Sequence, residues 1–81
     1  MLTEYLRAAL KHARFELLPD SGEFYGEIPE CNGVYATAST LEACRQQLEE
    51  VLEEWVLFRI HQHLALPAID GLELSVKEAV V

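Results

Sequence analysis

The side chains that could act as nucleophiles or bases are few in this sequence. The thiols are Cys31 and Cys44, and the imidazoles are His12, His61 and His63. A nucleophilic mechanism needs a thiol or hydroxyl that can meet a base. Cys44 falls on the apolar stripe of a predicted helix, where a small buried hydrophobe is expected. Cys31 falls in a predicted loop and could be exposed, but no glycine-rich nucleophile turn surrounds it. The sequence therefore predicts no catalytic residue.

Metal binding is the second chemistry to consider. His61 and His63 are two residues apart, and side chains at this spacing do not share a helix face. The same predicted helix carries a run of carboxylates that could hold magnesium: Glu49, Glu50, Glu53 and Glu54. They occupy the polar face of an amphipathic helix, which is typical of solvated surface. We therefore expect no metal site and no cofactor.

The composition bounds the size and the partners of the protein. Its 81 residues suit a single domain, residues 1–81, and the apolar fraction of 51% hints at a surface covered by a second copy. The net charge of −8 disfavours nucleic acid, because a chain with few cations releases few counterions from phosphates. It favours a basic protein partner, although the same charge can serve solubility alone.

Targeting signals are the next feature to test. Glu4, Arg7 and Lys11 interrupt what would have to be the apolar region of a signal peptide. The longest apolar run, "WVLF" at 55–58, is too short to span a bilayer. Two cysteines without a signal sequence do not indicate a disulfide framework. We expect a cytoplasmic protein.

The apolar periodicity predicts a helix followed by three strands. Apolar residues recur at helical spacing through the first twelve residues. Alternation then predicts strands at 14–18, 23–28 and 34–38. A turn at 19–22 joins the first two strands, and a loop at 30–33 carries the Asn-Gly turn signal.

A long helix is predicted from Thr40 to about His63. Ser39, followed three residues later by Glu42, is typical of a capping box. The last third, "WVLFRI", is apolar nearly all round, so either the first helix or a second subunit must cover it. The candidate self-association residues are Trp55, Val56, Leu57 and Phe58.

The segment after the long helix predicts a last strand. A linker at 65–71 contains Pro67 and Gly71, and residues 72–76, "LELSV", then alternate in polarity. A strand, a long helix and a further strand form a crossover connection. The predicted fold class is α+β, with a β-β-β-α-β unit and an extra helix at the N-terminus.

The order and spacing of several motifs over about residues 13–76 resemble the HicB antitoxin family of bacterial and archaeal toxin–antitoxin systems. The matching residues are Tyr25, Ile28 and Pro29 at a strand end, Gly33 in a loop, Ser39, Thr40, Leu41, Glu42 and Ala43 at a helix start, and Leu66 with Pro67 before the last strand. The resemblance implies a truncated ribonuclease H-like unit without its nuclease acids, homodimers or larger assemblies, and HicA, a small basic mRNA-cleaving toxin, as partner.

Two departures from the family pattern affect the expected role. The chain ends at Val81 without room for the DNA-binding segment that many members carry, so direct operator binding is not expected. The predicted helix before the first strand is additional, and it would cap the sheet or serve an interface.

These observations favour a non-enzymatic HicB-like antitoxin that binds and neutralises a small basic toxin. The alternative is an orphan, self-associating HicB-like module without a toxin, and a degenerate nuclease is a third reading. The candidate partner-binding residues combine aromatic rings with carboxylates: Glu23, Tyr25, Glu27, Glu30 and Tyr35. The same residues would equally suit an ordinary solvated sheet face.

Overall fold

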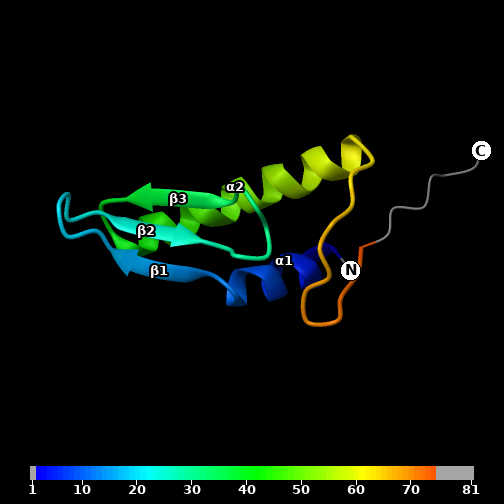
Figure 1. The fold of residues 1–81 in the computed structure, drawn as a ribbon, viewed down its shortest axis with the longest axis horizontal. Coiled ribbons are helices and arrows are strands. Elements are labelled where there is room, and N and C mark those ends of the chain that lie inside the picture. The colour runs from blue at the N-terminus through cyan, green and yellow to red at the C-terminus, as the bar shows by residue number, and fades with distance from the viewer. Residues whose placement is uncertain (1, 75–81) are drawn as a thin grey trace, which may run out of the picture.

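The computed structural model describes residues 2–74 and shows an α+β fold. Its elements, in chain order, are α1 (Leu2–Lys11), β1 (Arg14–Leu17), β2 (Phe24–Glu27), β3 (Tyr35–Ala38) and α2 (Leu41–His61). The strands form one antiparallel sheet in the order β1-β2-β3 (Figure 1). The helix and the three strands predicted before residue 39 are therefore confirmed, with boundaries that differ by one or two residues.

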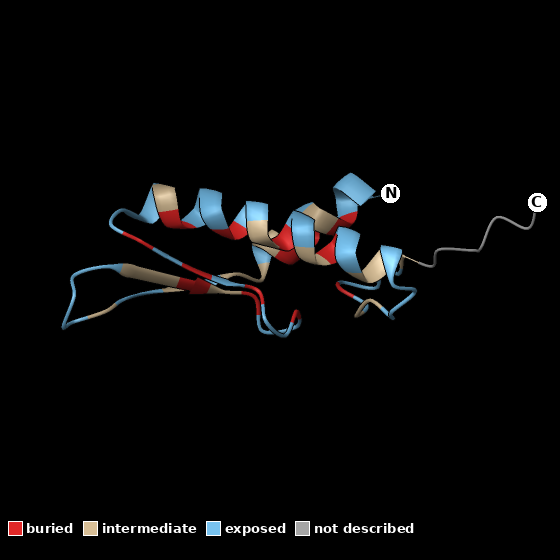
Figure 2. Cartoon of the chain, turned by 90° about the horizontal axis from the view of Figure 1, so that it is seen from above, coloured by how far each residue is buried: buried red, intermediate tan, exposed pale blue. Residues whose placement is uncertain are grey.

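The two helices lie on one side of the sheet (Figure 2). Helix α2 covers one sheet face, while α1 lies beyond the end of the sheet, beside the second half of α2 (Figure 1). The core forms along this contact, because each helix turns a narrow apolar stripe inward. The buried helix residues are Tyr5, Ala8 and Ala9 in α1, and Cys44, Leu48, Leu52 and Val56 in α2.

Gly26 allows α2 to lie close to the middle of the sheet. A Cβ atom built on Gly26 would lie 2.7 Å from Cε1 of Phe15 and 3.2 Å from Sγ of Cys44. The thiol of Cys44 also donates a hydrogen bond to the carbonyl oxygen of Ala36, at 3.5 Å. The missing side chain on β2 therefore leaves the space in which the Phe15 ring and the first turns of α2 pack.

The start of α2 differs from the prediction by one residue. Thr40, not Ser39, is the N-cap, and its Oγ1 accepts a hydrogen bond from the backbone N–H of Ala43 at 3.0 Å. The capping box predicted from Ser39 and Glu42 is therefore wrong. Both residue types can cap a helix, and the extended backbone of Thr40 places its hydroxyl over the first turn.

Replacing Thr40 with alanine is expected to lower the free energy of unfolding by about 1 kcal/mol, because an N–H of the first turn loses its acceptor. Urea unfolding followed by circular dichroism measures the change. Ser39→Ala is the matched control and is expected to change stability by only a few tenths of a kcal/mol, as surface substitutions do. An equal or larger loss in Ser39→Ala would contradict the assigned cap.

The chain after α2 folds back onto α1 without forming a fourth strand in the described residues. Leu72 makes only an isolated bridge with Ile69, so the strand predicted at 72–76 is not found over residues 72–74, and its last two residues lie outside the described range. Asp70 and Gly71 both have positive φ values, as a tight turn of this kind requires. Ile69 is buried.

The apolar second half of α2 is covered mainly within the chain. Val56 is buried, which corrects its prediction as a surface residue for self-association. Trp55 is half-buried, and its Nε1–H donates to the carbonyl oxygen of Asn32 at 3.1 Å. Only Leu57 and Phe58 of the four candidate residues remain exposed. The loop that holds Asn32 packs against α2.

Cys31 lies in this same loop and is buried, which corrects the expectation that it could be exposed. Its backbone N–H donates to the carbonyl oxygen of Ile28, and its carbonyl accepts from Val34. The loop is therefore a compact turn that points its thiol inward. Burial raises the pKa of Cys31 to about 11.

Candidate functional site

The candidate site is the sheet face that α2 does not cover, here called the open face. Strand register sets its composition, because residues directly opposite one another on neighbouring strands share a face. One row across the sheet contains Arg14, Glu27 and Tyr35. The next row contains Glu16, Tyr25 and Thr37.

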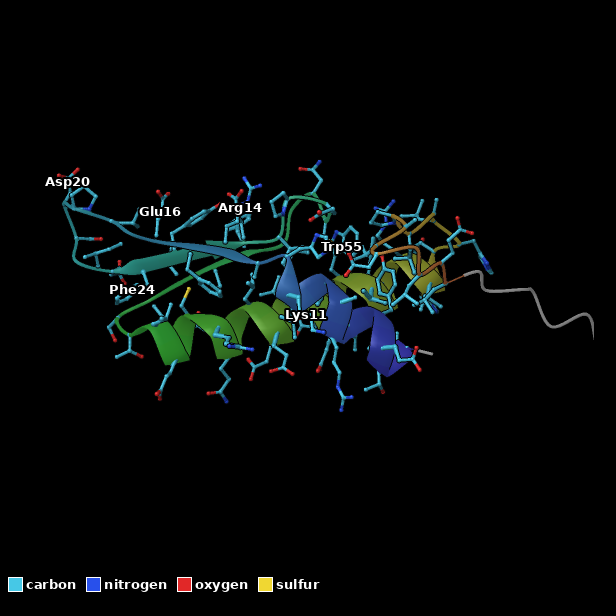
Figure 3. All side chains as sticks on the ribbon, turned by 90° about the horizontal axis from the view of Figure 1, so that it is seen from below. Lys11, Arg14, Glu16, Asp20, Phe24 and Trp55 are labelled. Atoms are coloured by element: carbon cyan, nitrogen blue, oxygen red, sulfur yellow. The ribbon has the colours of Figure 1, made fainter. Side chains whose placement is uncertain are left out.

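The view with side chains agrees with this assignment (Figure 3). Arg14 and Glu16 point away from the helices, whereas Phe24 lies on the side that faces α2 (Figure 3). Within residues 2–74, no helix or strand packs on the open face (Figure 2). Its side chains are therefore available to another molecule.

Two tyrosine rings form the apolar part of the open face. The ring centroids of Tyr25 and Tyr35 are 6.3 Å apart with an interplanar angle of 26°. The hydroxyl of Tyr25 donates a hydrogen bond to Oε1 of Glu27 at 3.0 Å. This bond raises the pKa of Tyr25, because the neutral phenol donates and the phenolate cannot. Tyr35 stays 59% exposed, so its ring can still be covered.

Two shallow hollows border these residues. One, of about 300 Å³, is lined by Arg14, Phe15, Glu16, Tyr25 and Glu27. The other, of about 230 Å³, lies where β2 and β3 meet their connecting loop, and Tyr25, Glu27 and Tyr35 belong to its lining. Tyr25 and Glu27 therefore separate two depressions that side chains of a partner can enter.

Three of the five predicted partner-binding residues come together on the open face: Tyr25, Glu27 and Tyr35. Glu23 lies outside the paired strands, in the turn between β1 and β2, where its backbone N–H bonds the hydroxyl of Ser21. Glu30 forms an ion pair with His12 instead. Sequence reasoning missed the three remaining members of the face, Arg14, Glu16 and Thr37, although the alternation of β1 pointed to the first two.

His12, Glu30 and Asp70 form a cluster that was not predicted, just beyond the end of α1. His12 bonds Glu30 through Nδ1 at 2.6 Å and Asp70 through Nε2 at 2.7 Å. Both ring nitrogens can donate only when the imidazole is protonated. The pKa of His12 is accordingly raised, mainly by the bond to Asp70 and then by that to Glu30, and the pKa of Glu30 is lowered by His12. The cluster joins the end of α1 to two loops.

The His12 cluster predicts a dependence of stability on pH. Because the pKa of His12 is raised, its contribution to stability is fully present below the ordinary histidine pKa of 6.5. This contribution is lost as pH rises through the raised pKa. The lowered pKa of Glu30 contributes above its ordinary value of 4.5 and is lost as pH falls through the lowered pKa. The contribution is therefore expected to be largest between pH 4.5 and 6.5.

This expectation is checked by measuring the free energy of unfolding in urea from pH 4 to 9 for wild type and for His12→Gln. Subtracting the two values removes the contributions of the other titrating groups. The difference should be largest in that window and shrink above it. His61→Gln, at an exposed position of α2, is the matched control for the loss of a histidine outside the cluster. A wild-type minus His12→Gln difference that stays constant with pH would contradict the assignment.

The remaining chemical groups are placed as follows. Cys44 is buried, and burial raises the pKa of its thiol, which disfavours the nucleophilic thiolate. The four carboxylates from Glu49 to Glu54 are all exposed on α2. Within the described range, no three histidine, cysteine or acidic side chains gather as metal ligands would, and no helix is long and apolar enough to cross a membrane.

The fold and the site together define a small two-layer α+β domain with one uncovered sheet face that carries tyrosines and carboxylates. The chain belongs to the UPF0150-like family, whose model matches residues 4–67. It is also similar to a solved structure, that of TTHA0281 from Thermus thermophilus. The two share 37% sequence identity, the match covers 95% of each chain, and the TM-score is 0.88. No curated protein matches the chain.

Proposed function

We propose that this protein is an antitoxin of the HicB kind that binds and neutralises a small basic, mRNA-cleaving toxin through the open face. The observation that carries the proposal is the pair of stacked tyrosines beside Glu27, on a sheet face left uncovered by the described elements. Membership of the UPF0150-like family supports it, because that family falls within the HicB and toxin–antitoxin-like group.

The chemistry of the open face suits arginine and lysine side chains. Glu16 and Glu27 supply carboxylates, which form strong charge-assisted hydrogen bonds with guanidinium groups. Tyr25 and Tyr35 supply flat rings on which a cation can stack. The net charge of −8 would also accelerate the encounter with a basic partner. A toxin whose active surface binds RNA is basic, so the same contacts would cover the surface that it needs.

The second candidate function is a self-associating module without a toxin. The exposed apolar residues Leu57 and Phe58 favour it, because they offer a surface that is separate from the open face. The two functions differ in whether a small basic protein is encoded beside the chain and binds it.

Co-expression tests the proposed function. The chain carries an affinity tag, and the adjacent small basic reading frame is expressed with it and without it. The proposal expects a complex that survives size-exclusion chromatography, and growth that is restored only when both proteins are made. Absence of a complex, or toxicity unchanged by the chain, would contradict it.

A further inference from the structure

Strand β3 forms one edge of the sheet, and within residues 2–74 no other strand pairs with its outer side (Figure 1). In an antiparallel ladder, successive residues direct their backbone N–H and C=O groups alternately toward the neighbouring strand and away from it. The backbone N–H of Ile28 donates to the carbonyl oxygen of Val34 at 3.2 Å, which fixes this alternation for β2 and β3. Tyr35 and Thr37 therefore direct their backbone groups outward, to the free edge.

Strand β1 forms the other edge of the sheet, and its alternation is fixed in the same way. The backbone N–H of Leu18 donates to the carbonyl oxygen of Glu23 at 2.7 Å, just beyond the paired residues. Phe15 and Leu17 therefore direct their backbone groups away from β2. The sheet thus has two edges with outward N–H and C=O groups, either of which could accept a further strand.

The two edges differ in how well they are protected from pairing. Proteins keep an edge strand from pairing with other chains by placing charged side chains or proline on it. Strand β1 carries Arg14 and Glu16, and Pro19 follows shortly after its end. Strand β3, with the sequence Tyr-Ala-Thr-Ala, has neither a charge nor a proline. The β3 edge is therefore the one suited to accept a further strand.

The described chain does not fill the β3 edge itself. The segment after α2 returns toward α1, where the hydroxyl of Tyr5 donates a hydrogen bond to the carbonyl oxygen of Pro67 at 2.6 Å. Within residues 2–74 no strand follows α2, and only an isolated bridge joins Ile69 and Leu72. The outward backbone groups of β3 are therefore left to water or to another chain.

We propose that the basic partner adds a strand of its own to the β3 edge, so that its backbone bonds the outward groups of Tyr35 and Thr37. This inference rests on the function proposed above and says how the open face holds that partner. Strand addition takes its affinity from main-chain hydrogen bonds and its specificity from side chains at alternate positions. It extends the open face by one strand, because the added side chains continue the rows of the sheet.

The side chains beside the β3 edge define the chemistry of the added strand. On the open face the ring of Tyr35 is exposed, and Glu27 stands opposite it on β2. An arginine or lysine of the added strand can stack on this ring, and its charge favours the nearby carboxylate. On the other face Ala36 and Ala38 are buried, so apolar side chains fit beside them. The partner's strand is therefore expected to alternate basic and apolar residues.

This chemistry favours a basic partner over a second copy of the same chain. A second β3 strand, paired along the same edge, would bring tyrosine, threonine and alanine but no cation. Tyr35 and Glu27 would then gain no charged group. A second copy is therefore an alternative occupant that the test has to separate from the basic partner.

Amide hydrogen exchange of the full chain, followed residue by residue by nuclear magnetic resonance, tests the proposal. The probe is the small basic protein proposed as the partner. Amide groups without a hydrogen-bond partner exchange fast, and pairing slows them. In the complex, the N–H groups of Tyr35 and Thr37 are expected to exchange at least about tenfold more slowly than in the free chain. Phe15 and Leu17 are the matched controls on the β1 edge, and their exchange should stay unchanged.

Each other outcome overturns the proposal in a recognisable way. A complex without slower exchange at Tyr35 and Thr37 would exclude strand addition there, while the proposed function would stand. Slower exchange at Phe15 and Leu17 instead would place the added strand on β1. Slow exchange at Tyr35 and Thr37 in the free chain, at concentrations where it self-associates, would assign the edge to a second copy. No complex at all would contradict the proposed function and this inference together.

A proline variant gives a second readout. Thr37→Pro removes an outward N–H without removing a bond between β2 and β3, and edge strands accept proline at such positions. It is expected to weaken the complex by about tenfold, because an acceptor of the added strand loses its donor. Leu17→Pro makes the same change on the β1 edge and should leave affinity unchanged, with circular dichroism confirming that both variants fold. Unchanged affinity in folded Thr37→Pro, or an equal loss in both variants, would overturn the proposal.

Discussion

Replacing Leu48 with alanine is expected to lower the free energy of unfolding by about 3 kcal/mol. Leu48 is fully buried in α2, at the centre of the helix stripe that packs on the sheet. The loss has two parts: fewer apolar atoms leave water on folding, and the missing side chain leaves a cavity in the core. A domain of this length has a total stability of only about 4–12 kcal/mol, so the variant should lose much of it.

Urea unfolding gives the measurement, and Leu41→Ala gives the matched control. Both residues are leucines of the same helix, but Leu41 is 48% exposed and should change stability by no more than about 0.5 kcal/mol. Equal losses at the two positions would mean that α2 does not turn the face of Leu48 toward the sheet.

Replacing Tyr35 with alanine is expected to weaken binding of the basic partner by about 2 kcal/mol, or about 30-fold. The exposed ring stacks beside Tyr25 on the open face, so its removal should leave the fold intact while deleting a contact surface. Isothermal titration calorimetry with the purified basic protein measures the change. Unchanged affinity in a folded Tyr35→Ala variant would exclude Tyr35 from the interface.

A charge variant on the open face has its own control. Glu27→Lys should weaken the complex at low salt more than at high salt, because exposed charges are screened by ions. Glu42→Lys changes net charge equally at an exposed position of α2 and should have a much smaller effect. Equal losses in both variants would mean that overall charge, and not the open face, governs binding.

The strands could be predicted because their side chains alternate in polarity over short, well-bounded segments. The same alternation placed Tyr25, Glu27 and Tyr35 together on one face. It also separated Arg14 and Glu16 from Phe15, but it could not say which residues of β2 they stand opposite. Register is a property of the sheet, and a one-residue shift would place the other set of side chains there.

The helix start and the apolar end of α2 show where local signals are ambiguous. Ser39 and Thr40 are both good caps, and only the backbone conformation selects the second. The run from Trp55 to Phe58 is apolar on every side, so periodicity could not separate Val56 in the core from Phe58 on the surface. The position of α1 beside α2, which periodicity does not give, decides which of these residues is buried.

The His12 cluster could not be predicted from local patterns. Glu30 is 18 residues and Asp70 is 58 residues from His12 in the sequence, and only the folding of two loops brings the three together. The Asp-Gly pair at 70–71 was a usable signal for a tight turn, which the linker assignment overlooked. Cys31 was misplaced for a similar reason, because a loop is usually exposed and this one packs inward.

Chemical-shift mapping tests whether the open face binds a basic protein. The isotope-labelled chain is titrated with the small basic protein proposed as its partner, and the backbone amide signals are followed. We expect the largest shifts on β2 and β3, around Tyr25, Glu27 and Tyr35, with few changes on the outer side of α2. Shifts confined to α1 and α2, or no shifts at saturating partner, would contradict it.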